Sequence, residues 1–132
     1  MEYVYFLGNA NSDDTAIKIG VTYDIAKRVH QLQSIAPFRL ACIEYIAVTD
    51  GRAYEIERTL HRILRGKRLK GEWFDIKKSD IMPAVEEMAR QLALGELIVH
   101  DHKGVPPPPG RPAYQTQIRS ATQGPIFLAE NI

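Results

Sequence analysis

Two short apolar runs open the chain, and their spacing is typical of a β-hairpin. The first covers residues 3–8 and the second residues 16–21. Residues 9–15 between them are rich in Asn, Asp and Ser, which favours a turn. Both alternating sets of side chains in the first run are apolar. We therefore expect this strand to be covered on both faces of its sheet.

Apolar residues recur with helical spacing in three later segments. The predicted helices cover residues 24–33, 52–65 and 79–95. Asp24 is a suitable N-cap residue for the first of them. Residues 40–48 read as a third strand, and residues 70–75 as a short strand or an ordered loop. The pattern predicts an α+β domain in which helices flank a small three-stranded, mainly antiparallel sheet.

The C-terminal part of the chain differs in composition from the rest. Four consecutive prolines at 106–109 indicate a polyproline spacer, and mostly polar residues follow it. We assign residues 1–98 to a folded domain, and residues 99–132 to a proline-rich linker with an extended or partly disordered tail. The Pro-Gly-Arg-Pro segment at 109–112 resembles arms that lie in the DNA minor groove, although a flexible linker is the favoured interpretation.

The charges nearly balance, with 17 Lys and Arg against 16 Asp and Glu, so net charge favours no class of partner. One stretch nevertheless carries six cations and no acid: Arg58, Arg62, Arg65, Lys67, Arg68 and Lys70. Such a patch can bind a polyanion such as DNA. It can equally be a solvated helix face, and both interpretations stay open.

The single cysteine, Cys42, excludes a disulfide within the chain and a cysteine-based zinc site. Because it lies between Ala41 and Ile43, we expect a small core residue. There is no signal-peptide pattern and no apolar run long enough to span a bilayer. We therefore expect a cytoplasmic protein that has no membrane partner.

Several short motifs follow one another in a fixed order along the hairpin and the first two helices. They are Tyr3-Val4-Tyr5, Lys18-Ile19-Gly20, Arg28, Glu57-Arg58-Thr59-Leu60-His61 and Gly71-Glu72-Trp73-Phe74. In their order and spacing they resemble the GIY-YIG nuclease superfamily, in a divergent phage and bacterial branch. The resemblance covers residues 2–76 and leaves the tail unexplained.

The resemblance implies a metal-dependent endonuclease that cuts or nicks DNA. Glu57 would hold one divalent ion, Mg²⁺ or alternatively Mn²⁺, which polarises the phosphate and stabilises the leaving oxygen. Arg28 would bind the non-bridging oxygens, and Tyr5 would position or deprotonate the attacking water. Tyrosine is a poor base at its ordinary pKa of about 10. A cation must therefore lie nearby, and we expect Lys18 to supply it.

Two positions depart from the family pattern. Tyr3 stands where the family has glycine, and Lys18 stands where it has tyrosine. The second departure exchanges a hydroxyl for a cation, so the group that activates water stays open. No organic cofactor is implied. A single small domain cuts one strand most readily, and cutting both would require a homodimer or two visits.

Supporting roles are expected for Tyr3, Gly20 and His61. His61 can back up Glu57, or it can pack beside Trp73. Trp73 and its neighbour Phe74 are more typical of a core than of a base-stacking platform.

Each candidate also has a purely structural interpretation. Tyr5 can be a core aromatic, Lys18 a solvated strand end and Arg28 the partner of a helix acid, while Glu57 can be an ordinary surface residue. Two alternative functions therefore accompany the nuclease hypothesis. One is an inactive GIY-YIG-like module that binds nucleic acid, and the other is a protein-interaction module.

Overall fold

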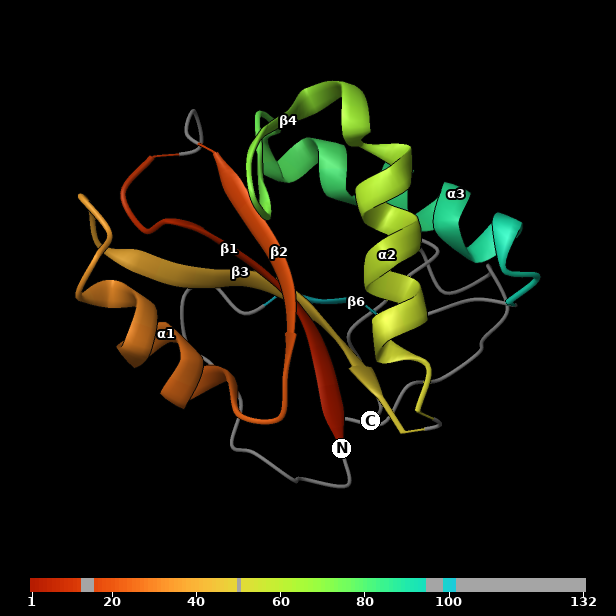
Figure 1. The fold of residues 1–132 in the computed structure, drawn as a ribbon, viewed down its shortest axis with the longest axis horizontal. Helices are drawn as coiled ribbons and strands as arrows, with labels where there is room; N and C mark the ends of the chain where they lie inside the picture. Colours follow the sequence, from red (N-terminus) through yellow and green to blue (C-terminus); the bar gives the residue numbers. More distant parts are fainter. Residues whose placement is uncertain (13–15, 50, 95–98, 102–132) are drawn as a thin grey trace.

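A computed structural model describes residues 1–12, 16–49, 51–94 and 99–101 (Figure 1). The polyproline spacer and the Pro-Gly-Arg-Pro segment lie outside the described residues, as does the predicted end of the third helix at Gly95. Within the described part, no helix is long and apolar enough to cross a membrane.

Six strands form one antiparallel sheet, so the prediction of a three-stranded sheet was wrong in number. The strands are β1 (Glu2–Asn9), β2 (Ile17–Thr22), β3 (Leu40–Val48), β4 (Arg68–Lys70), β5 (Trp73–Phe74) and β6 (Val99–Asp101). Their order across the sheet is β4-β5-β2-β1-β3-β6. The three additional strands have only two or three residues each, too few to show an alternating pattern. Strand β6 comes from the segment assigned to the linker.

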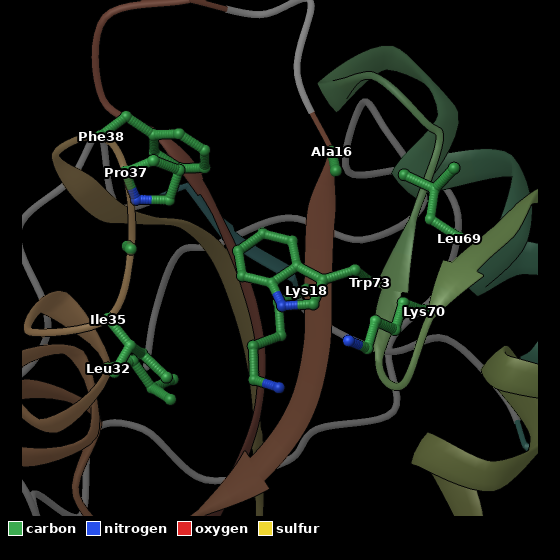
Figure 2. A pocket seen from close by; sticks show the side chains of 10 residues that line it. Ala16, Lys18, Leu32, Ile35, Pro37, Phe38, Leu69, Lys70 and Trp73 are labelled. Atoms are coloured by element: carbon green, nitrogen blue, oxygen red, sulfur yellow. The ribbon is translucent and has the colours of Figure 1, made fainter.

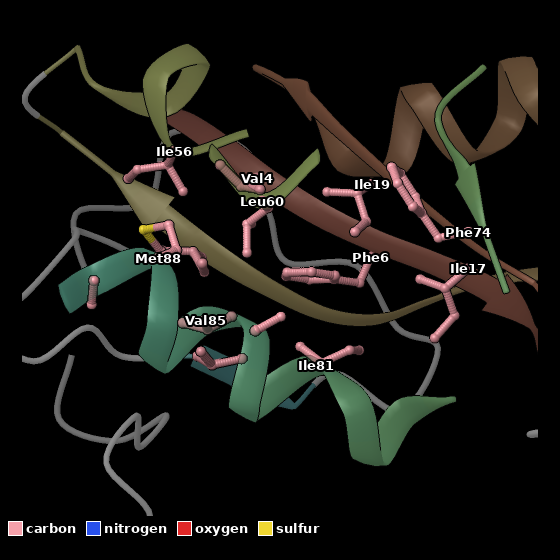
Figure 3. Close-up of a cluster of buried hydrophobic side chains, with 14 of the residues drawn as sticks. Val4, Phe6, Ile17, Ile19, Ile56, Leu60, Phe74, Ile81, Val85 and Met88 are labelled. Atoms are coloured by element: carbon pink, nitrogen blue, oxygen red, sulfur yellow. The ribbon is translucent and has the colours of Figure 1, made fainter. Parts of the chain in front are cut away.

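The central strand β1 is covered on both faces, as its sequence predicts. Val4 and Phe6 belong to one buried apolar cluster, shown in Figure 3. Tyr3, Tyr5 and Leu7 belong to a second cluster on the opposite face, which also contains the fully buried Cys42. Burial of both side-chain sets explains why the strand reads as a continuous apolar run.

Three helices cover the two faces of the sheet (Figure 1). The helix α1 (Ile25–Gln33) packs on the tyrosine side through Ile25, Val29 and Leu32. The helices α2 (Ala53–Ile63) and α3 (Ile81–Gln91) pack on the other side, through residues such as Leu60 and Val85. Short 3-10 turns at Arg65–Lys67 and Lys78–Asp80 connect these elements. The sheet edge at β2 therefore lies between helices from both layers.

The N-cap predicted for α1 is confirmed, because Asp24 Oδ1 accepts a hydrogen bond of 3.0 Å from the Lys27 amide. Replacing Asp24 with Ala is expected to lower the free energy of unfolding by about 1 kcal/mol, the usual cost of losing such a cap. Replacing it with Asn is expected to cost much less, since Asn caps almost as well. Urea unfolding measures both values. Equal losses in the two variants would show that the cap is not what Asp24 contributes.

Candidate functional site

Five polar side chains converge at the edge of β2. Arg28 Nη1 donates a hydrogen bond of 3.4 Å to the Tyr5 hydroxyl. Lys18 Nζ lies 3.1 Å from Glu72 Oε1, and the Glu72 carboxyl in turn contacts that of Glu57. We call these residues, Tyr5, Lys18, Arg28, Glu57 and Glu72, the charged cluster. It contains all four residues predicted to be catalytic, together with one that was not.

The sheet register explains how the charged cluster forms. Strand β5 pairs with β2 at Ile17 and Lys18, and the Ile19 amide donates a hydrogen bond of 3.0 Å to the Glu72 carbonyl. Within the described residues, this pairing ends there and leaves the rest of β2 free on that side. The turn before β5 thus carries Glu72 to the edge of β2. Gly71, whose φ of +57° suits glycine, shapes that turn.

Gly20 is the point at which the tyrosine and the carboxylate approach the sheet. It pairs with Tyr5 across the β1–β2 ladder. A Cβ at this position would overlap the Tyr5 hydroxyl, and would lie 2.6 Å from Tyr5 Cζ and 3.0 Å from Glu72 Oε1. The supporting role predicted for Gly20 therefore has a steric basis, because a side chain would occupy the space that these groups use.

The two carboxyl groups of the charged cluster differ in environment. Glu57 is buried on α2, whereas Glu72 is partly exposed. Burial, and then the charge and hydrogen bond of Glu72, raise the pKa of Glu57 to about 7, although Lys18 acts in the opposite direction. Burial and the Glu72 carboxyl thus both favour the protonated form of Glu57, whereas a bound cation would favour its ionised form.

The pKa of Tyr5 is raised, whereas a tyrosine that acts as a base needs a lowered pKa. Burial is the largest cause and raises it to about 12, while the neighbouring Arg28 lowers it and Glu72 raises it. The expectation that Lys18 supplies the cation for Tyr5 was wrong, because Lys18 is directed to Glu72 and the cation at the hydroxyl is Arg28. The raised pKa leaves Tyr5 protonated at neutral pH, which favours a hydrogen-bonding role for it over that of a base.

Two of the predicted supporting residues have clear structural contacts. Tyr3 lies buried against Tyr45, with ring centroids 5.8 Å apart. His61 Nε2 lies 2.9 Å from the Ile19 carbonyl and 4.0 Å from Glu57 Oε2. Its ring packs on Phe74 at 5.0 Å between centroids, rather than on Trp73. His61 thus connects α2 to β2 next to the charged cluster.

The six cations between residues 58 and 70 are all exposed, and those that border a hollow do not all border the same one. Arg58 and Arg62 border a hollow that also includes Leu92, beyond the end of α3. Arg68 and Lys70 lie on β4, and Lys70 lines a second pocket together with Lys18. Of the predicted nucleic-acid-binding residues, Lys70 is thus brought close to the charged cluster.

Glu72 is the site residue that sequence reasoning missed. It was quoted as part of the Gly71-Glu72-Trp73-Phe74 motif, but no role was assigned to it. Its proximity to Glu57 depends on the pairing of β5 with β2. That pairing cannot be predicted from the sequence of so short a strand. The usable signal was an acid beside a glycine turn, directly before an aromatic pair.

A divalent ion fits the carboxyl pair. No cluster of three or more His, Cys, Asp or Glu side chains that could hold a metal is found among the residues described. Mg²⁺ commonly needs only one or two carboxylates, because waters and substrate phosphates complete its coordination. Burial is the first cause of the raised pKa of Glu57, and the neighbouring Glu72 carboxyl is the second. A cation bound between the two carboxyl groups would relieve the repulsion between them.

The chain matches the model of a known protein family. The model of the T5orf172 domain matches residues 2–89, which extends past the residues 2–76 covered by the motifs. No curated protein and no solved structure matched the chain. This domain is phage-associated and of the GIY-YIG/HNH-like nuclease kind, and a nuclease-like domain would bind DNA. Since the match covers more than half of the chain, the protein belongs to the T5orf172 domain family.

Proposed function

We propose that the protein is a metal-dependent endonuclease of the GIY-YIG type, which hydrolyses or nicks DNA phosphodiester bonds. The observation that carries this proposal is the charged cluster. Two cations, a phenol and a carboxyl pair meet at one sheet edge, which is the set of groups that phosphodiester hydrolysis requires.

The cations would bind and orient the phosphate. The planar guanidinium of Arg28 suits two non-bridging oxygens at once. Its hydrogen bond to Tyr5 connects phosphate binding to the tyrosine hydroxyl. Tyr5, protonated at neutral pH, orients the attacking water by hydrogen bonding. Lys18 adds positive charge on the other side of the edge and holds Glu72 in place.

The carboxyl groups would divide two tasks between them. Glu57 would hold the divalent ion, Mg²⁺ or Mn²⁺, which when bound neutralises charge on the phosphate and on the leaving oxygen. Glu72, the more exposed of the two, would accept the proton from the attacking water, because the raised pKa of Tyr5 makes that residue unsuited to the task.

The test is nicking of supercoiled plasmid by the purified protein with Mg²⁺ or Mn²⁺. Nicks are expected with either ion, and are expected to disappear with EDTA and in the Glu57→Ala variant. Glu55→Ala is the matched control, since Glu55 is an exposed carboxylate on the same helix that pairs with Arg52 at 2.8 Å. Cleavage that persists in EDTA, or in Glu57→Ala, would overturn the proposed metal-dependent mechanism.

A second candidate is a nucleic-acid-binding module without catalysis. The observation that favours it is the state of Tyr5, whose pKa is raised, with Lys18 in place of a second tyrosine. Binding to DNA that is unchanged by metal and by Glu57→Ala, without nicking, would support this candidate. In either case DNA affinity must fall steeply with salt, because phosphate contacts release counterions.

A further inference from the structure

An apolar pocket of about 350 Å³ adjoins the charged cluster. Its lining comes from the end of α1 and the loop after it, from the start of β2, and from the β4–β5 hairpin (Figure 2). Lys18 forms part of the wall, with Nζ 5.8 Å from the centroid of the Trp73 ring and 3.1 Å from Glu72. The Lys18 side chain thus lines the pocket and is also a member of the charged cluster.

The pocket walls are aromatic and aliphatic, with cations at the rim. Trp73 is half-buried there, and its ring meets that of Phe38 edge to face at 6.3 Å between centroids. Ile35 and Leu69 stand on opposite sides of the pocket, and these two residues are 80% and 59% exposed. Lys70 and Lys18 add positive charge. The core does not need these exposed apolar groups.

We infer that this pocket receives one unpaired nucleobase of the DNA strand whose phosphate lies at the charged cluster. The inference rests on the proposed function and specifies its substrate. A flat base suits an aromatic wall, where stacking tolerates any sequence. The two lysines complement the backbone phosphates on either side of that base. Bases in an intact duplex are stacked and paired, so only an unpaired or extruded base can enter.

The consequence is a preference for DNA that carries an unpaired nucleotide over perfectly paired duplex. Trp73 is the single tryptophan of the chain, so tryptophan emission, excited at wavelengths that tyrosine does not absorb, reports on this pocket alone. A base stacked on the indole is expected to quench that fluorescence.

The experiment titrates the full chain, in EDTA so that no cutting occurs, with two labelled duplexes that differ by one unpaired nucleotide. Anisotropy of the label measures binding, and tryptophan emission measures occupancy of the pocket. We expect the duplex with the unpaired nucleotide to bind more tightly, by roughly tenfold, as for the gain of one base–aromatic stack. We also expect quenching with that duplex alone.

A variant pair isolates the pocket from general electrostatics. Ile35→Glu places a carboxylate on the exposed rim, and Gln31→Glu adds the same charge one helical turn away, at an exposed residue that does not line the pocket. Ile35→Glu is expected to abolish the preference for the unpaired nucleotide, whereas Gln31→Glu is expected to retain it.

The outcomes separate this inference from the proposed function. Binding of both duplexes with equal affinity and without quenching would overturn the inference, assign the pocket to another occupant such as a protein partner, and leave the nuclease proposal standing. Absence of binding to either DNA would overturn both.

Discussion

Glu57→Gln is expected to abolish nicking and, at the same time, to make the metal-free protein more stable at alkaline pH. Loss of activity should exceed a hundredfold, because even residues that only support a metal ligand cost roughly 10–100-fold when replaced. The gain in stability follows from the pKa of Glu57, which the folded protein raises from 4.5 to about 7.

The sign of the pH dependence is fixed by this shift. Between about pH 4.5 and 7, folded Glu57 retains a proton that the unfolded chain has lost. Stability of the wild-type protein therefore falls as pH rises through that window, and stays reduced above it. Gln cannot ionise, so the variant escapes this loss.

Differential scanning calorimetry in EDTA at pH 5 and pH 8 measures the effect. The melting temperature of Glu57→Gln is expected to exceed that of the wild type by at least about 5 °C at pH 8, since 1 kcal/mol moves the midpoint of so small a domain by about 4–8 °C. At pH 5 the difference should be much smaller. Mg²⁺ should raise the melting temperature of the wild type and leave the variant unchanged. A variant that melts below the wild type at pH 8 would contradict the electrostatic account.

Gly20→Ala is expected to abolish activity through a single added methyl group. The new Cβ would lie 2.6 Å from Tyr5 Cζ, and the tyrosine ring is fully buried, so it must move with its neighbours. Overpacking of this kind costs about 1–3 kcal/mol of stability. The larger effect is expected on the rate of nicking. The displaced Tyr5 hydroxyl would lose its hydrogen bond to Arg28 and move away from Glu72.

Gly8→Ala in the neighbouring strand β1 is the matched control. There the added Cβ meets the flexible end of the Ile43 side chain, far along the strand from Gly20. We expect a stability loss at this position with activity retained. Combining Gly20→Ala with Tyr5→Phe should cost somewhat less stability than the two separate losses combined, since the nearest clashing atom, the hydroxyl oxygen, is gone while the ring carbon Cζ remains. Plasmid nicking and urea unfolding give both readouts, and strict additivity would mean that the Tyr5 hydroxyl is not the group displaced.

Much of the fold could be predicted from local patterns. The long strands and all three helices have periodic apolar residues, and Asp24 marks a helix start that the structure confirms. The short strands β4 and β6 could not be predicted, and the segment that contains β5 read only as a short strand or an ordered loop, because two or three residues carry no period. Their pairing is decided by neighbours distant in the sequence.

The same distinction holds at the site. The order of the motifs predicted that four residues share one site, and the structure places all four at one sheet edge. They are Tyr5, Lys18, Arg28 and Glu57. The direction of Lys18 could not be inferred, because it depends on Glu72, which arrives through the β5–β2 pairing. The pKa values of Tyr5 and Glu57 depend first on burial, which motif spacing does not reveal.

Because the charged cluster straddles the sheet, it exists only in the fully assembled molecule. Tyr5 and Arg28 come with the layer under α1, whereas Glu57 comes with the layer under α2 and α3. A chain leaving the ribosome completes the first layer's helix long before Glu57 and Glu72 are synthesised. A chain cut short before Glu57 would therefore contain Tyr5, Lys18 and Arg28 but lack both carboxyl groups of the charged cluster.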